Sequence, residues 1–210
     1  MFLEAKIVRI LFQGDSVTDA GRSREDLADL GTGYPLYAAA QLRERHPDRE
    51  WTFINRGVSG NRTGDLLARW QEDCLDLKPD LVSILIGIND TWRAFDADDP
   101  TMTERFKDNY RRVLEETRRR THAKILLLEP FVLHDTPDKD AWRADLDPKI
   151  QAVRRLAREY ADGYVPLDGL FAAACVEKGP LHWTADGVHP VQAGAKLIAD
   201  AYVQAVERLL

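Results

Sequence analysis

Five short apolar runs, each followed by a segment with helical periodicity, constrain the fold of this chain of 210 residues most strongly. Such alternation is typical of repeated βα units, which place a mostly parallel sheet between two layers of helices. We therefore expect an α/β fold, a three-layer α/β/α sandwich of about five parallel strands. The expected strands lie near Ile7–Gln13, Thr52–Ile54, Leu81–Ile86, Lys124–Leu128 and Tyr164–Pro166. The expected helices lie near Tyr34–His46, Thr63–Cys74, Met102–Arg120, Pro148–Tyr160 and Val191–Leu210.

The size and composition fit one domain that spans residues 1–210. Apolar residues make up 44% of the chain, which is enough for the core of a single sheet and its helices. No Pro/Ser-rich linker, internal repeat or low-complexity tract divides the sequence. The net charge of −6 comes from interspersed charges of both signs, so neither nucleic acid nor an anionic membrane surface is an expected partner. A neutral or weakly polar small molecule fits better.

The N-terminal residues Met1–Lys6 include acidic and basic side chains where a secretory signal would need an unbroken apolar region. No stretch approaches the length of a membrane span, so a cytoplasmic protein is expected. The two cysteines, Cys74 and Cys175, lie far apart in helical patterns and form neither a zinc framework nor a disulfide scaffold. We expect both to be buried thiols.

Polar motifs follow each of the first three expected strands. They are Gly14–Ser16, Asn55–Thr63 and Gly87–Asp90. Because the carboxyl ends of parallel strands meet at one edge of the sheet, these motifs can converge in space. A serine at such an edge becomes a nucleophile only if a base activates it, and the late segment Asp186–His189 supplies an imidazole with a carboxylate to orient it. The pattern indicates a serine hydrolase.

These four segments, in this order and across most of the chain, resemble the four sequence blocks of the SGNH (GDSL-type) hydrolase superfamily. The resemblance implies a flavodoxin-like fold and an esterase that uses Ser16 as nucleophile. His189 is then the general base, and Asp186 orients its imidazole. The resemblance also implies an oxyanion hole made of the backbone N–H groups of Ser16 and Gly60 and the side chain of Asn89.

Each of these residues also has a purely structural interpretation. Ser16 could cap a helix, Gly57 competes with Gly60 as the backbone donor, and Asn89 could form an Asx-turn. The presence of all four blocks favours the catalytic roles, and the family position favours Gly60 over Gly57. Val17 stands where the Gly-Asp-Ser-Leu motif has leucine. We expect this difference to alter the local packing and to leave the catalytic mechanism unchanged.

Further runs resemble the branch of the superfamily that includes bacterial xylan acetylesterases, namely Thr18–Arg22, Leu30–Tyr34 and Gly87–Arg93. This resemblance implies hydrolysis of short-chain esters, O-acetyl groups on xylo-oligosaccharides or related sugars above all, by a protein that forms homo-oligomers. Tryptophan faces can stack on sugar rings, although the same residues could be core or interface aromatics. The candidates for substrate contacts are Asp15, Tyr34, Trp92, Arg93 and Trp183, with Arg22 as a further possible donor to sugar hydroxyls.

Two other functions remain as alternatives. A lysophospholipase or an acyl thioesterase would use the same catalytic groups but would need an extended apolar groove. A catalytically silent carbohydrate-binding or assembly protein would have lost at least one of Ser16, Asn89, Asp186 and His189, and all four are present. The remaining histidines show no paired metal-ligand spacing, so neither a metal nor a cofactor is expected.

Overall fold

The computed structural model describes residues 7–210 and contains a five-stranded sheet in which every strand is parallel to its neighbours. The strand order is β2-β1-β3-β4-β5, which is the flavodoxin-like order, and the expected fold class is confirmed. The expectation about Met1–Lys6 lies outside the described residues. The strands are β1 (Ile7–Gly14), β2 (Glu50–Asn55), β3 (Leu81–Leu85), β4 (Lys124–Leu128) and β5 (Gly163–Val165).

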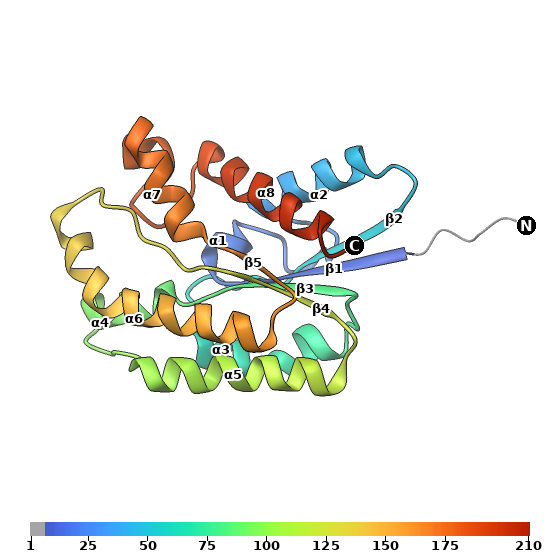
Figure 1. Ribbon diagram of the computed structural model, residues 1–210, viewed down its shortest axis with the longest axis horizontal. Helices are drawn as coiled ribbons and strands as arrows, with labels where there is room; N and C mark the ends of the chain where they lie inside the picture. Colours follow the sequence, from blue (N-terminus) through green and yellow to red (C-terminus); the bar gives the residue numbers. More distant parts are fainter. Residues whose placement is uncertain (1–6) are drawn as a thin grey trace, which may run out of the picture.

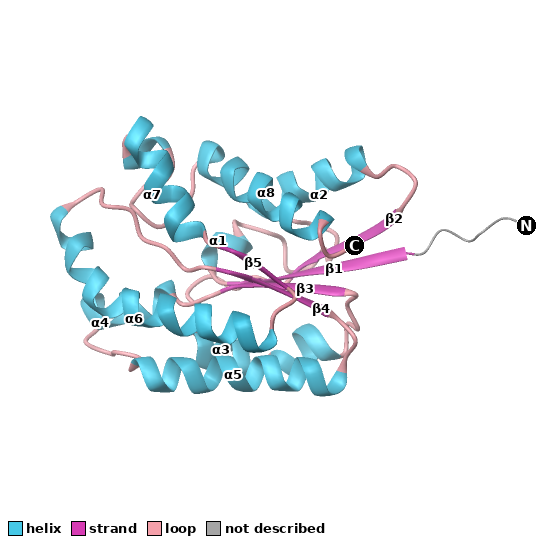
Figure 2. Ribbon diagram, in the orientation of Figure 1, coloured by secondary structure: helices cyan, strands magenta, loops and turns pink. Residues whose placement is uncertain are grey.

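Helices cover both faces of the sheet and complete the three layers. Figure 1 shows α2, α7 and α8 on one face and α3, α5 and α6 on the other, and Figure 2 separates these helices from the strands by colour. The helices are α1 (Ser16–Asp19), α2 (Tyr34–Arg45), α3 (Thr63–Ala68), η1 (Gln71–Leu75), α4 (Ile88–Asp96), α5 (Thr103–Arg120), α6 (Pro137–Tyr160), α7 (Leu167–Glu177), η2 (Pro180–His182) and α8 (Gln192–Glu207).

The apolar side chains of β1 divide between two cores because successive residues of a strand point to opposite faces. Ile10 and Phe12 pack with α2 and α8, whereas Leu11 packs with α3, η1 and α5. The whole of β3 is buried. Burial on both faces explains why the strands read as nearly continuous apolar runs in the sequence.

The order of the strands creates a crevice between β1 and β3. The chain leaves β1 toward the face that carries α2, and it reaches β3 from the opposite face, which carries α3. Ligand sites of open α/β sheets lie at such a switch point, beyond the carboxyl ends of the strands. Gly14 and Leu85 are register partners at the ends of these two strands, so the motifs that follow them emerge side by side.

Two of the expected helices have different bounds. The helix expected over Thr63–Cys74 is divided into α3 and the π-helical turn η1, and Trp70 and Cys74 are both buried in the core. The helix expected to begin at Pro148 begins instead at Pro137 and contains Pro148 in its interior. A proline removes one N–H from a helix, and here the burial of Trp142 before it holds the first half of α6 in place.

Helices α1, α4 and α7 were not expected from the sequence. The polar start of α4 was interpreted as a loop motif, and Pro166 before α7 was interpreted as the end of a strand. The final helix spans Gln192–Glu207 and is shorter at both ends than the expected Val191–Leu210, and Pro190, expected to suit its first turn, lies before it in a β-bridge with Thr184.

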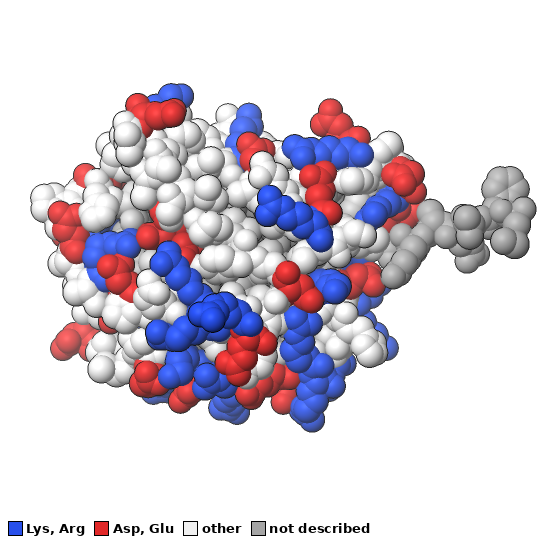
Figure 3. Space-filling view, viewed as in Figure 1, with Lys and Arg blue, Asp and Glu red and all other residues white. Residues whose placement is uncertain are grey.

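The two cysteines differ in burial. Cys74 is buried as expected, but Cys175 is only partly buried, so the expectation of two buried thiols is wrong for Cys175. Figure 3 shows acidic and basic side chains intermixed over the viewed face. Within residues 7–210, no helix has the length and apolar character that crossing a membrane requires.

Candidate active site

The sharp turn after β1 brings Ser16 to the carboxyl edge of the sheet. Asp15 is the N-cap residue of α1, and its carboxylate accepts a hydrogen bond from the N–H of Val17 at 3.1 Å. A Cβ atom on Gly14 would lie 2.3 Å from the carbonyl oxygen of Leu85, so only glycine fits where the strand ends. The turn therefore presents both the hydroxyl and the backbone N–H of Ser16 at the start of a helix.

Asp15 is almost completely buried beside this serine. Burial raises the pKa of its carboxyl group to about 7, although the hydrogen bond from Val17 and the nearby His189 favour the charged form. The sequence interpretation placed Asp15 among the substrate contacts. Its position gives it a different task, which is to cap the helix that carries Ser16.

Ser16, His189 and Asp186 form a continuous chain of hydrogen bonds. The Oγ atom of Ser16 lies 2.9 Å from Nε2 of His189, and Nδ1 of His189 lies 2.7 Å from Oδ2 of Asp186. The other carboxylate oxygen of Asp186 accepts the N–H groups of Val188 and His189 at 3.0 and 2.8 Å. An ionised Asp186 keeps the imidazole proton on Nδ1, which leaves Nε2 to accept the proton of the hydroxyl group.

The environment of Asp186 favours its charged form. Partial burial by itself would raise the pKa of this carboxyl group. The hydrogen bonds from the N–H and the side chain of His189 and from the N–H of Val188 together outweigh that effect, so the pKa lies below its ordinary value.

A tight turn positions Asp186 and His189 relative to each other. Thr184 and Pro190 pair across it, and Gly187 adopts a positive φ of 81° at its tip. The carbonyl oxygen of Gly187 accepts the N–H of Leu133 at 2.8 Å, and a Cβ atom on Gly187 would lie 2.7 Å from the carbonyl oxygen of Leu133. The turn is thus fixed against the segment that follows β4.

The three expected oxyanion donors come from the three neighbouring motifs. Asn89 lies in the first turn of α4, is 3% exposed, and donates one amide hydrogen to the carbonyl oxygen of Asn61 at 3.1 Å. This bond orients the amide group and leaves its second hydrogen for another acceptor. Gly60 is exposed, with a positive φ of 82° that favours glycine in this turn.

Asp19 connects the helix of Ser16 to the loop of Gly60. Its carboxylate is nearly buried and accepts the N–H and the hydroxyl of Ser59 at 2.9 and 3.1 Å. The same oxygen pairs with Arg24 at 2.9 Å. A Cβ atom on Gly57 would lie 2.3 Å from the N atom of Asp19, so the loop and the helix are in direct contact. Gly57 is therefore a packing residue, in agreement with its expected structural role.

Arg69 holds the other side of the same loop. Its guanidinium donates to the side chain of Asn61 at 2.7 Å and to the carbonyl oxygens of Arg56 and Gly14 at 2.9 and 3.2 Å. Gly14 immediately precedes the turn that carries Ser16. One planar group with several donors therefore fixes the end of β1 and the loop after β2 together.

Asp90 and Lys149 anchor α4, the helix that contains Asn89. The carboxylate of Asp90 accepts the N–H and the hydroxyl of Thr63 at 3.0 and 2.7 Å, although burial raises its pKa to about 6. The completely buried ammonium of Lys149 donates to the carbonyl oxygen of Asp90 and the hydroxyl of Thr91, both at 3.2 Å, and pairs with Asp145. These contacts limit the movement of the Asn89 amide.

A pocket of about 180 Å³ opens beside the Ser16 hydroxyl. Its walls include Val17, Tyr34, His189 and Pro190. Tyr34 is buried, and its hydroxyl lies 3.3 Å from Oγ1 of Thr18, so it forms part of the pocket wall from within the core.

The other residues expected to contact substrate differ in their positions. The ring of Trp92 lies 5.7 Å from that of His189, which places it at the site. Arg93 pairs with Asp96 of its own helix, and Trp183 donates its indole N–H to the carbonyl oxygen of Lys178. Arg22 is buried and donates to the carbonyl oxygen of Gly57 at 3.0 Å, so it holds the loop after β2.

The sequence interpretation did not identify Asp19, Arg69 and Lys149 as supporting residues. Asp19 has a local signal, since it follows Ser16 by one helical turn and therefore lies on the same side of the chain. Arg69 and Lys149 lie in helical segments rich in charge, where nothing in the spacing distinguishes a buried cation from a solvated one.

Comparison with known proteins yields consistent matches. Residues 12–197 match the model of the GDSL-like Lipase/Acylhydrolase family. The chain is 35% identical over 207 residues to the acetylxylan esterase of Geobacillus stearothermophilus, a match that covers 94% of this chain and 93% of that one. A crystal structure of that esterase has a TM-score of 0.88 at 33% identity and covers 95% of this chain and 94% of its own.

A second crystal structure, of a protein from Parabacteroides merdae described as a GDSL-like lipase, has a TM-score of 0.91. It is 35% identical to this chain, and the match covers 97% of each chain. The solved structures of the Geobacillus esterase include catalytic mutants in which one serine or one aspartate is replaced by alanine.

Proposed function

This chain belongs to the GDSL-like lipase/acylhydrolase family and is a carboxylic ester hydrolase, and from this premise we propose that it removes O-acetyl groups from xylo-oligosaccharides or related sugars. The observation that carries the proposal is the chain of hydrogen bonds from Ser16 through His189 to Asp186. A serine that already donates to an oriented imidazole is prepared for attack on a carbonyl carbon.

The reaction proceeds through an acetyl-enzyme in this proposal. The Oγ atom of Ser16 bonds to the ester carbonyl carbon while Nε2 of His189 takes its proton. Collapse of the tetrahedral intermediate breaks the bond to the sugar oxygen, which receives the proton from His189 and leaves as an alcohol. A water molecule then attacks the acetyl group, again with His189 as base, and acetate departs as Ser16 regains its proton.

The negative charge of each tetrahedral intermediate is stabilised by the N–H groups of Ser16 and Gly60 and by the free amide hydrogen of Asn89. Asp186 stabilises the imidazolium that forms at the same moment, and its lowered pKa keeps it charged for that purpose. Because Asp19, Arg69 and Asp90 fix the three donor segments, the donors need little rearrangement during the reaction.

The size of the pocket supports a short acyl group. Its volume of about 180 Å³ is below the range of roughly 300–1,000 Å³ that is usual for pockets that enclose larger ligands. An acetyl group fits beside Ser16, whereas a long acyl chain would extend into solvent. The similarity to an acetylxylan esterase over 94% of the chain supports an acetylated xylose unit as the alcohol part.

Release of acetate from acetylated xylo-oligosaccharides tests this function directly. The assay is run beside a series of aryl esters of increasing acyl length, with Ser16→Ala as the inactive variant and Ser23→Ala as the matched serine control. We expect acetate release by the unaltered protein and by Ser23→Ala, and the fastest aryl ester hydrolysis with acetate. A strong preference for long acyl chains would contradict the proposal and favour a lysophospholipase.

A further inference from the structure

Helix α4 carries three residues with side chains of increasing exposure that lead away from the oxyanion site. Asn89, Trp92 and Phe95 follow one another at intervals of three positions, so consecutive members are neighbours in a row that turns partly around the helix. Asn89 is 3% exposed, Trp92 is partly buried and Phe95 is 46% exposed. Two aromatic side chains of α4 thus lie between Asn89 and the molecular surface.

The first of these aromatic residues lies beside the general base. The ring centroid of Trp92 is 5.7 Å from that of His189. His189 is the group that protonates the departing sugar oxygen in the proposed mechanism, so the sugar must lie within reach of this imidazole. Trp92 therefore borders the space for the leaving sugar, and Phe95 follows it on α4.

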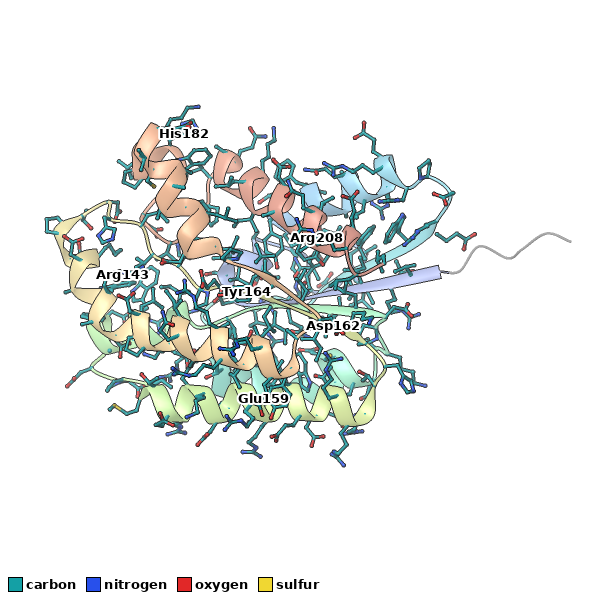
Figure 4. All side chains as sticks on the ribbon, in the orientation of Figure 1. Arg143, Glu159, Asp162, Tyr164, His182 and Arg208 are labelled. Atoms are coloured by element: carbon teal, nitrogen blue, oxygen red, sulfur yellow. The ribbon has the colours of Figure 1, made fainter. Side chains whose placement is uncertain are left out.

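A buried tryptophan from α6 fixes both aromatic side chains. The ring of Trp142 lies 5.1 Å from that of Trp92 and 5.6 Å from that of Phe95, and it stacks on Phe95 with an interplanar angle of 18°. The ammonium of Lys139 lies 4.2 Å from the Trp142 ring. Figure 4 shows, through Arg143, that this first half of α6 projects beyond the strands, at the end of the molecule where the carboxyl ends of the strands lie. One face of Phe95 is thereby covered, and 46% of the residue still meets solvent.

We propose that Trp92 and Phe95 form a stacking subsite for the xylosyl unit next to the acetylated one, an inference that rests on the proposed function. A pyranose ring presents flat patches of C–H groups, and an aromatic ring that is already held in place binds such a patch at little cost in conformational entropy. The pocket at Ser16 is too small to enclose more than the reacting unit. A longer substrate must therefore extend over the adjacent surface, and Trp92 lies against His189, which is one wall of this pocket.

The subsite is tested by comparing two substrates of the full-length enzyme, monoacetylated xylotriose and a methyl xyloside with one acetyl group. The measured quantity is the ratio of kcat/KM for the trisaccharide to kcat/KM for the monosaccharide. We expect Phe95→Ala to lower this ratio about three- to tenfold, the effect of losing one aromatic contact. Phe95→Tyr should retain the ratio, because the flat ring remains. Val176→Ala is the matched control, since Val176 is an apolar residue of α7 that is 87% exposed.

Inhibition by xylotriose provides a second measurement. Unacetylated xylotriose should inhibit hydrolysis of an aryl acetate less strongly in Phe95→Ala than in the unaltered protein, by the same factor. An unchanged ratio together with unchanged inhibition in Phe95→Ala would overturn the subsite, as would an equal loss in Val176→Ala. Failure of the proposed function has a different signature, because the enzyme would then hydrolyse aryl acetates and neither acetylated sugar, and the subsite would fall with it.

Discussion

The Oγ atom of Ser16 and the Nε2 atom of His189 lie 2.9 Å apart although 173 positions separate the two residues in the chain. Ser16 follows the first strand directly, and His189 stands in the turn before the last helix. Gly194 allows this proximity, because α8 packs closely against the carbonyl oxygen of Trp183 and so brings the turn over the edge of the sheet. The nucleophile and its base are thus joined by the packing of the first and last elements of the fold.

Replacement of Asn89 by alanine should reduce catalysis strongly while leaving the fold intact. The amide supplies one donor to the tetrahedral intermediate, and removal of such a donor typically lowers kcat by about 10²–10³. The KM for an aryl acetate should change little, because the donor acts mainly in the transition state. Steady-state kinetics of Asn89→Ala beside Asn109→Ala, a partly buried asparagine of α5, provide the measurement. Equal kinetics in the two variants would exclude Asn89 from the oxyanion hole.

Asp19 should act as a positioning residue for the loop of Gly60. Asp19→Ala removes the acceptor for both the N–H and the hydroxyl of Ser59, and a displacement of the loop by about 1 Å can lower kcat by about 10²-fold. Asp19→Asn keeps one acceptor oxygen and should recover part of the activity. The kcat and KM of both variants are compared with those of Asp108→Ala, an exposed carboxylate on α5. An increase in KM without a decrease in kcat would refute this role. Equal kcat values in the alanine and asparagine variants would refute it as well.

The buried carboxyl group of Asp15 should make stability fall as pH rises. Its pKa is raised from 3.8 to about 7 in the folded protein, so between these values the folded state binds more protons than the unfolded state. Stability therefore decreases as pH rises through this range and levels off above about pH 7. An asparagine at this position caps α1 equally well but cannot ionise.

Urea unfolding at about pH 5 and about pH 8 measures this effect of Asp15. The free energy of unfolding of Asp15→Asn, relative to the unaltered protein, should increase between these two pH values by at most about 3 kcal/mol. A difference that stays constant across this range would mean that the carboxyl group ionises normally in the folded protein.

Gly194 should be intolerant of any side chain. A Cβ atom at this position would lie 2.1 Å from the carbonyl oxygen of Trp183, so Gly194→Ala must displace the turn that carries His189 or shift α8. We expect a loss of roughly 1–3 kcal/mol in the free energy of unfolding, accompanied by lower kcat. Gly169→Ala in α7 is the control, since a Cβ atom there meets nothing within 4 Å and should raise helix stability by up to about 1 kcal/mol. Thermal unfolding of both variants measures this difference in stability. Equal unfolding temperatures in Gly194→Ala and Gly169→Ala would show that the close approach of α8 to Trp183 is unimportant.

The strands of the sheet could be predicted from the sequence because a strand that is buried on both faces is a nearly continuous apolar run. All five strands lie where apolar runs were found, and the polar motifs that follow β1 and β3 do meet at one edge. The contact of His189 with Ser16 was expected on a different basis, namely the resemblance of their segments to two of the family's sequence blocks.

The helices near the site were harder to predict because their signals are mixed. The nine residues of α4 begin with Ile88, and the two that follow it, Asn89 and Asp90, also favour turns, so propensity alone does not identify the helix. The helical segment before Pro148 depends on the burial of Trp142 against α4, which is a tertiary contact. The same limit applies to Arg69 and Lys149, whose partners lie in other elements.

Covalent labelling tests most directly whether Ser16 is the nucleophile. The protein is incubated with a serine-directed phosphonate, its intact mass is measured, and the modified peptide is sequenced, with Ser16→Ala and His189→Ala treated in parallel. We expect one adduct per chain, located on Ser16, with no adduct in Ser16→Ala and much slower labelling in His189→Ala. An unlabelled Ser16 in folded protein that still releases acetate, or an adduct on another residue, would contradict the claim that Ser16 is the nucleophile.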